Sequence, residues 1–238
     1  MRQLALELAS SPAPTLDNFV TGANAEVVTA LQALVHGAGA DRFIYLWGGT
    51  GSGCTHLLRA VARDLCAAGR NVRWYAADTV ISAEAVAGED VVVVDDVQCL
   101  SESAQIKLFN IFNKLRDFGG ILLAAGDVPP ARLPLRGDLL TRLAWGLVYE
   151  VHALSEDDRR AAVQAYAAAR GFVLPREVTD FLLVRLPRDL HSLRAMVDML
   201  DRHSLEQKRA VTVPLARELL LAAQKTNDLE TGKGGSQE

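Results

Sequence analysis

The sequence predicts an α/β fold with a five-stranded parallel sheet, followed by a small all-helical domain. Short apolar runs alternate with helical patterns between about residues 43 and 151, and this alternation is typical of a parallel sheet. From Ser155 onward the patterns are helical only. A glycine-rich stretch over residues 48–55 joins the first apolar run to the helical pattern behind it, which is the context of a phosphate-binding P-loop.

The glycine-rich stretch reads Gly-Gly-Thr-Gly-Ser-Gly-Cys-Thr, and a helix with Leu57, Leu58 and Val61 on one face follows it. Glycines let backbone N–H groups point at an anion, and the helix N-terminus adds partial positive charge. The pattern G-x-x-x-x-G-K-[ST] is satisfied except that Cys54 occupies the lysine position. The candidate phosphate-binding residues here are Gly48, Gly51, Ser52, Gly53, Cys54 and Thr55.

Cys54 changes what this loop can do, because a thiol at neutral pH is a weak, uncharged donor. Loss of one charge-assisted hydrogen bond costs about 1.5–3 kcal/mol, so nucleotide affinity should fall about ten- to a hundred-fold. We therefore expect a nucleotide-shaped loop without efficient hydrolysis of its own. A glycine-rich turn with no ligand is the alternative. Thr55 remains available to Mg²⁺.

The elements of the α/β part follow from local patterns. An amphipathic pattern predicts a helix over residues 24–35, and a second long helix spans 103–118, where Gly119 and Gly120 stop it. A short helix is expected over 137–143. The run over 91–94 is all valine, as in a strand buried on both faces. The predicted strands are 43–47, 72–76, 91–94, 121–125 and 147–151.

The helical part begins at Ser155, which forms a capping-box-like start with Asp158. Prolines at positions 175, 187 and 214 mark breaks or first turns. The predicted helices are 156–170, 175–185, 188–206 and 213–225. The predicted division of the chain is a peptide and linker over 1–14, the α/β domain over 15–153, the helical domain over 154–225 and a disordered tail over 226–238.

Carboxylates follow two of the predicted strands. Asp95 and Asp96 come directly after the four valines, and Asp127 follows the next strand. The carboxyl ends of the strands in a parallel sheet lie beside the P-loop. Of Asp95 and Asp96, one is therefore placed to hold Mg²⁺ and the other to orient water. Asp127 is expected to reach the γ-phosphate or the attacking water, and an ordinary turn aspartate is the equal alternative.

The N-terminus carries alternating leucines at positions 4, 6 and 8 behind Gln3, and a Ser/Pro linker follows. This pattern fits either a terminal strand or a short peptide that enters a partner's pocket.

Composition excludes several classes of protein. Half of the 238 residues are hydrophobic and the net charge is −4, so no overall field attracts nucleic acid or an anionic membrane. Cys54, Cys66 and Cys99 form no metal-binding spacing, and reduced thiols in a cytoplasmic protein are the simplest interpretation. We find no signal peptide and no apolar run near 18 residues, so no membrane association is expected.

Several ordered motifs together resemble a known family. Together they look like the AAA+ core of DnaA-type bacterial replication initiators. The motifs are the P-loop, V-V-V-V-D-D-V-Q, L-A-A-G-D-V-P-P, L-L-T-R-L-A-W-G and the helical domain. The resemblance covers about residues 15–225 and is strongest to the regulatory inactivators of DnaA, which are clamp-binding paralogues. It implies an AAA+ core with a helical lid domain.

The resemblance also implies roles for particular residues. T-L-D-N-F-V-T-G is similar to the family segment that flanks the adenine, which adds Phe19 and Val20 to the nucleotide-binding candidates. Arg142 stands where the family has an arginine finger, which would reach a neighbour's γ-phosphate. A helix-end arginine paired with an acid such as Asp138 is the alternative. His56 is a further nucleotide candidate, although packing on the helix surface is its simpler interpretation.

In the helical domain, His191 aligns with the family's sensor arginine. Arg188 and Arg194 lie three residues to either side and are expected to share its helix face, and substitution for the missing arginine by one of them is left open. Neutral imidazole gives no bidentate phosphate contact, so ADP or another nucleoside diphosphate with Mg²⁺ is the expected ligand, and ATP would bind weakly.

The N-terminal hexapeptide looks like the family's sliding-clamp-binding motif, with Gln3, Leu4, Leu6 and Leu8 as contact residues. The implied function is negative regulation of replication initiation. The chain would bind the clamp of DNA polymerase III, meet DNA mainly through that clamp, and use Arg142 to promote hydrolysis of ATP on the initiator. Self-association is left open. The alternatives are a clamp-linked adaptor that recruits another factor without stimulating hydrolysis, and a stand-alone P-loop ATPase or kinase.

Overall fold

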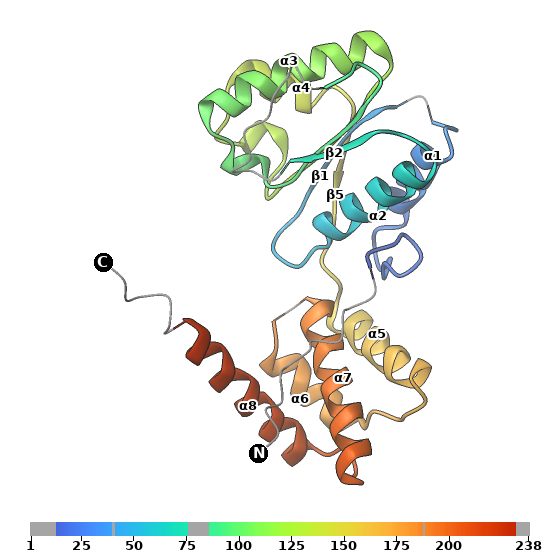
Figure 1. Cartoon of the computed structure of the whole chain (residues 1–238), viewed down its shortest axis with the longest axis vertical. Coiled ribbons are helices and arrows are strands. Elements are labelled where there is room, and N and C mark those ends of the chain that lie inside the picture. The colour runs from blue at the N-terminus through green and yellow to red at the C-terminus, as the bar shows by residue number, and fades with distance from the viewer. Residues whose placement is uncertain (1–12, 40, 76–85, 188, 232–238) are drawn as a thin grey trace. The chain divides into compact units, whose positions relative to one another are not determined.

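The computed structural model describes residues 13–39, 41–75, 86–187 and 189–231, with side chains up to residue 222. The chain divides into two compact units, Ala13–Leu154 and a second that begins at Ser155. The first is an α/β unit and the second contains only helices among its described residues. Figure 1 shows the elements of each unit.

The α/β unit is built on one parallel sheet in the order β2-β3-β4-β1-β5. Its strands are β1 (Phe43–Trp47), β2 (Val72–Tyr75), β3 (Val91–Val94), β4 (Ile121–Gly126) and β5 (Leu147–Glu150). Its helices are α1 (Ala25–Val35), α2 (Cys54–Ala67), α3 (Glu102–Phe118) and α4 (Gly137–Leu143), with single 3-10 turns η1 (Val97–Cys99) and η2 (Pro130–Arg132).

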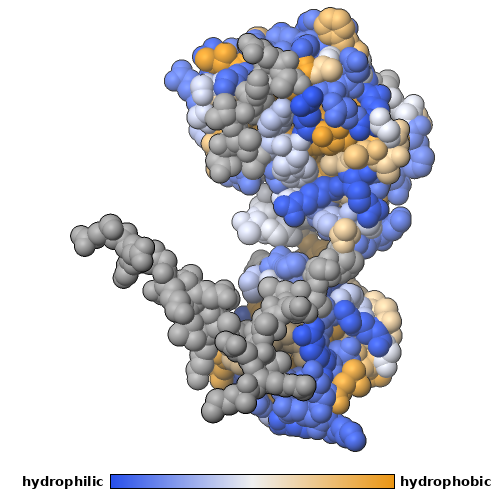
Figure 2. Space-filling view, in the orientation of Figure 1, coloured by the Kyte–Doolittle hydropathy of each residue, from blue (hydrophilic) through white to orange (hydrophobic). Residues whose placement is uncertain are grey.

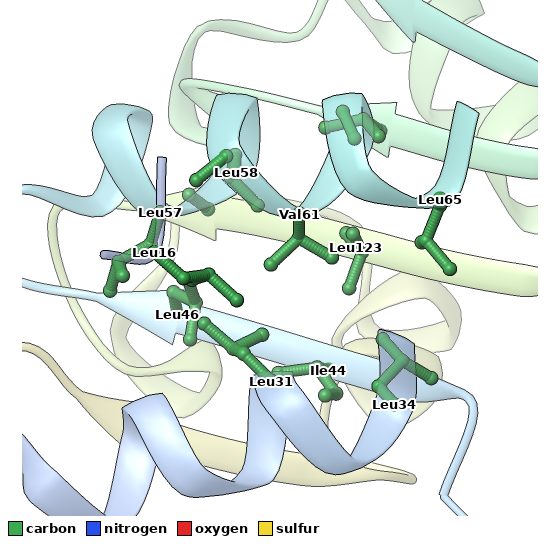
Figure 3. Packing of buried hydrophobic residues seen from close by; sticks show 14 of the residues in the cluster. Leu16, Leu31, Leu34, Ile44, Leu46, Leu57, Leu58, Val61, Leu65 and Leu123 are labelled. Carbon is green, nitrogen blue, oxygen red and sulfur yellow. The ribbon is translucent and has the colours of Figure 1, made fainter. Parts of the chain in front are cut away.

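Helices cover both faces of this sheet, with α1 and α2 on one side and α3 and α4 on the other (Figure 1). Because side chains alternate along a strand, Ile44 and Leu46 pack toward α1 and α2, whereas Phe43 and Tyr45 pack toward α3 and α4. Figure 3 shows the first of these layers, where leucines of α1 and α2 meet Ile44, Leu46 and Leu123 of β4. Both layers consist of buried apolar side chains.

The strand order brings three chain segments together at one edge. β4 lies between β1 and β3, with Trp47 opposite Gly126 and Val94 opposite Ala124. The segments that follow β1, β3 and β4 therefore leave the sheet side by side at its carboxyl edge. Ligands of open parallel sheets bind at this edge.

The helical unit contains α5 (Glu156–Ala169), α6 (Arg176–Arg185), α7 (Leu190–Gln207) and α8 (Val213–Thr231). The Ser155 hydroxyl accepts a hydrogen bond from the Asp158 amide at 3.1 Å, which caps α5 as the sequence predicted. Buried apolar side chains, among them Val163, Leu182, Leu193 and Leu215, form a core of its own. Hydrophilic residues dominate the visible surface of each unit, and smaller hydrophobic patches lie among these hydrophilic residues (Figure 2).

Two expectations differ from the structure. The last helix continues to Thr231, whereas the sequence predicted its end at residue 225. Most of the predicted tail over 226–238 lies outside the described residues. No glycine or proline interrupts the chain before Gly232, so nothing stops the helix earlier. The helix predicted over 188–206 begins instead at Leu190, because Asp189 caps it by accepting a hydrogen bond from the Ser192 amide at 2.7 Å. Arg188, which the sequence placed in this helix, lies outside the described residues.

Candidate functional site

The loop after β1 and the first residues of α2 form one wall of a cleft of about 470 Å³, a size within the ~300–1,000 Å³ typical of small-molecule sites. The opposite wall comes from the segments after β3 and β4. The cleft is lined by residues 48–55, Asp95, Asp96, Gln98, Ala125, Gly126 and Asp127. It therefore brings together the predicted loop residues and all three predicted carboxylates.

The backbone of the loop requires glycine at defined places. Gly51 and Gly53 have φ angles of 82° and 103°, in the left-handed region that favours glycine. A Cβ on Gly48 would lie 2.4 Å from the Val151 carbonyl oxygen and 2.7 Å from the Ser52 Oγ, so no larger residue fits there. Such a close-packed turn that leads into a helix N-terminus is an anion cradle.

Asp95 is buried at the end of β3, and one of its carboxylate oxygens accepts a hydrogen bond from the Asp96 amide at 3.1 Å. Burial raises the pKa of Asp95 above its usual value, a contact from the Thr55 side chain lowers it, and the Asp96 charge raises it further. The Thr55 hydroxyl and the Asp95 carboxylate thus face one another. This pair fits a Mg²⁺ ion, which takes oxygen ligands from one or two protein groups and from phosphate.

Asp96 adopts φ 51° and ψ 47°, a left-handed conformation that is uncommon for a residue with a side chain. The Gln98 amide donates a hydrogen bond to the Asp96 carboxylate at 3.2 Å, and Gln98 also lines the cleft. Sequence reasoning missed Gln98. The signal was available, because Gln98 stands three positions after Asp95 and side chains at i and i+3 lie on the same side of a 3-10 turn.

Cys54 supplies no positive charge to the cleft. Its Sγ lies 3.4 Å from the Ser52 Oγ. Burial raises the pKa of the Cys54 thiol to about 11, with the nearby Asp95 charge acting in the same direction. The thiol is therefore neutral at physiological pH. All the charged side chains among the described lining residues, Asp95, Asp96 and Asp127, are acidic.

Phe19 and His56 lie beside the loop rather than in the cleft. The Phe19 ring is 5.5 Å from the His56 ring, and a Cβ on Gly53 would lie 2.8 Å from the Phe19 ring. His56 Nε2 lies within hydrogen-bond distance of the Thr15 carbonyl oxygen, at 3.0 Å. These contacts fasten the segment before α1 to the first turn of α2. Val20 follows this segment and is not among the residues that line the cleft.

Arg142 lies on the last turn of α4, away from the lining of the cleft. Its guanidinium carbon is 5.4 Å from the ring centre of Phe109, 5.6 Å from that of Phe112 and 5.7 Å from that of Trp145. Asp138 instead pairs with Arg136 at 3.0 Å. The alternative that Asp138 neutralises Arg142 is therefore wrong.

His191 lies on the first turn of α7 in the helical unit, where its side chain is exposed. Arg194 lies one turn further along, and its guanidinium carbon is 5.4 Å from the ring centre of Tyr166. The predicted clamp-contact residues Gln3, Leu4, Leu6 and Leu8 lie outside the described residues, as does Arg188.

Comparison with known families decides the relationship. The family named bacterial DnaA ATPase domain matches residues 11–87 and 78–150, which together make up more than half of the chain. The chain belongs to the DnaA-related AAA+ family. The family named Hda, lid domain, matches residues 156–220, which is consistent with the Hda type of DnaA-related protein. Both the predicted resemblance and the predicted fold class are confirmed.

Solved structures agree on the fold. Domain III of the Thermotoga maritima replication initiation protein DnaA is 24% identical with a TM-score of 0.75, and the match covers 89% of this chain and 97% of that one. AMPPCP-bound DnaA from Aquifex aeolicus is 24% identical with a TM-score of 0.68, covering 80% and 66% of the two chains. The RuvB branch migration motor of T. maritima shares the fold at 15% identity, with a TM-score of 0.67 and coverage of 88% and 72%.

Membership in the DnaA-related family implies that this AAA+ unit binds a nucleotide, and the cleft fits one. The close-packed glycine loop can cradle phosphates, and Thr55 with Asp95 can hold a metal ion beside them. None of the described helices is long and apolar enough to cross a membrane.

Proposed function

We propose that this chain is a negative regulator of chromosomal replication initiation. In this proposal Gln3, Leu4, Leu6 and Leu8 attach it to the sliding clamp of DNA polymerase III, and its contact with DNA is mainly through that clamp. The clamp-bound protein then presents Arg142 to ATP held by a DnaA-type initiator and promotes hydrolysis there. The chemistry takes place in the partner's site, with one catalytic group supplied from this chain.

The observation that supports this function best is the contrast in charge between the chain's own cleft, which is acidic, and Arg142, which is positively charged. Within the part of the chain that the structure describes, every charged residue lining the chain's own cleft is acidic. Arg142, by contrast, makes no ion pair with any described residue, and its guanidinium lies within cation–π range of three aromatic rings. A guanidinium without a carboxylate partner is free to stabilise negative charge on another molecule. An arginine supplied in trans can accelerate phosphoryl transfer about 10³- to 10⁵-fold.

The chain's own cleft would hold ADP or another nucleoside diphosphate with Mg²⁺, and would bind ATP weakly. Thr55 and Asp95 are the proposed metal ligands, and the loop over 48–55 is the proposed phosphate cradle. Asp96, held by Gln98, would orient water if triphosphate were bound. Mg²⁺ would supply the positive charge that the P-loop lysine supplies in related sites.

The test measures ATP hydrolysis by the initiator with clamp loaded on DNA. Wild-type protein should stimulate hydrolysis, and Arg142→Ala should remove the stimulation while clamp binding is unchanged. Arg116→Ala is the matched control, because Arg116 is a surface arginine of α3 already paired with Asp117 at 2.9 Å. A chain without residues 1–9 should lose clamp binding. Equal rates for wild type and Arg142→Ala would support the adaptor function instead.

A further inference from the structure

Arg142 is held in an aromatic cage formed by Phe109, Phe112 and Trp145. The three ring centres lie 5.4–5.7 Å from the guanidinium carbon, inside the ~6 Å range of a cation–π contact. The rings come from two places in the sequence, since Phe109 and Phe112 are on α3 and Trp145 follows α4. The Nε atom of Arg142 is buried and has no hydrogen-bond partner among the described residues.

The cage is anchored to the central sheet. The Phe112 ring is fully buried and lies 4.5 Å from the ring of Phe43 on β1. Beside Trp145, Gly146 approaches the Phe43 backbone so closely that a Cβ would lie 1.9 Å from its carbonyl oxygen. Phe112 and the backbone next to Trp145 are therefore both packed against the same strand residue.

Aromatic rings hold a guanidinium in a way that suits a group acting on a second molecule. A carboxylate partner would neutralise the charge and would have to be displaced before phosphate could bind. Ring faces orient the group and exclude water from one side, and they leave its charge intact. Of the five N–H donors of arginine, the one on Nε is enclosed, so the terminal amino groups remain to contact phosphate.

The geometry points to Phe109, Phe112 and Trp145 as positioning residues that pre-organise Arg142 for its action in trans. This inference rests on the proposed function, because it concerns the rate at which Arg142 acts. Trp145 is the residue to test, since its side chain is 58% exposed and its replacement need not disturb the core. Phe112 is fully buried, so its truncation would create a cavity.

The experiment compares Trp145→Leu with Trp145→Phe in the initiator hydrolysis assay with clamp on DNA. Trp145→Leu removes the ring but keeps apolar volume, and we expect the maximal rate to fall about two- to five-fold, the size of one lost cation–π contact. The half-saturating concentration should stay unchanged, and Trp145→Phe should restore most of the rate. Phe118→Leu is the control, because Phe118 is 68% exposed at the far end of α3.

A double variant separates positioning from a general structural effect. In an Arg142→Ala background, Trp145→Leu should have no further effect on the rate. In the isolated protein, the Nε–H signal of Arg142 should show a ring-current shift in the nuclear magnetic resonance spectrum that Trp145→Leu reduces and Phe118→Leu does not.

The outcomes are distinct. If the initiator hydrolyses ATP at the same rate with wild type and with Arg142→Ala, the proposed function fails and this inference fails with it. If Arg142→Ala gives slow hydrolysis but Trp145→Leu stimulates the initiator as well as wild type does, only the inference is overturned. It is also overturned if Trp145→Leu raises the half-saturating concentration without changing the maximal rate, since Trp145 would then be a docking contact.

Discussion

The Sγ atom of Cys54 lies 3.4 Å from the Oγ atom of Ser52, and both residues line the cleft at the N-terminus of α2. The thiol takes the place at which the P-loop pattern has lysine, and burial raises its pKa to about 11, so it is neutral at physiological pH. The loop thus retains the shape of a phosphate site and lacks its principal charge. We therefore expect position 54 to influence strongly how tightly the chain binds a nucleotide.

Replacing Cys54 with lysine should strengthen nucleotide binding. A new charge-assisted hydrogen bond to phosphate contributes about 1.5–3 kcal/mol, so the dissociation constant for ADP should fall about ten- to a hundred-fold. Titration calorimetry with ADP and Mg²⁺ measures this directly. Cys66→Lys adds the same charge at an exposed position of the same helix, and it should leave the affinity unchanged. Equal affinities for wild type and Cys54→Lys would mean that the loop does not hold phosphate.

Alanine at position 48 should destabilise the α/β unit, whereas alanine at position 49 should not. The added methyl group on Gly48 would meet the Val151 carbonyl oxygen and the Ser52 side chain, and overpacking of this kind typically costs about 1–3 kcal/mol. A Cβ on Gly49 meets no atom within 4 Å, so its effect should stay within about 0.5 kcal/mol. Urea unfolding of the two variants tests the difference, and similar midpoints would contradict it.

The sequence predicted the sheet well because each strand carries strong local signals. The four valines over 91–94 form β3 with the predicted bounds, since a continuous β-branched run between turn residues has no competing interpretation. Helix ends were predicted well where a glycine or a cap marks them, as at Gly119 and Ser155. The end of α8 was not, because no such residue precedes Gly232.

The candidate site was predictable to the same degree. Asp95, Asp96 and Asp127 lie in one cleft because acids that end neighbouring parallel strands emerge at the same edge. The surroundings of Arg142 were not predictable. Phe109 and Phe112 have the spacing of ordinary core residues on a helix, and Trp145 is more than thirty positions away in the sequence. Only the packing of α4 against α3 brings their rings around one guanidinium.

Asp95→Asn should stabilise the nucleotide-free protein near neutral pH. Burial raises the pKa of Asp95 in the folded state, so folding favours the protonated carboxyl. Protonated Asp95 therefore stabilises the folded state relative to ionised Asp95. This contribution is complete below pH 3.8, the ordinary pKa of an aspartate, and is lost as the pH rises through the raised pKa of the folded state. Asparagine is neutral at every pH, so its advantage should be present at pH 7 and disappear toward pH 3.8. Thermal unfolding across this range tests the sign, and a variant less stable than wild type at pH 7 would refute it.

Removal of Mg²⁺ should abolish nucleotide binding by the wild-type protein. The charged side chains among the described lining residues are the carboxylates Asp95, Asp96 and Asp127, and nucleotide phosphates would add like charge among them.

A chelator should therefore prevent ADP binding by wild type, whereas Cys54→Lys should retain part of its affinity because lysine offsets the same charge. Asp95→Asn should depend less on Mg²⁺ than wild type does: it should bind ADP more weakly in Mg²⁺ because a metal ligand is lost, and it should lose less affinity in chelator because one repulsive charge is gone. Titrations of ADP with and without chelator compare all three proteins, and wild-type affinity that is indifferent to Mg²⁺ would show that a cation outside the described lining neutralises the phosphates.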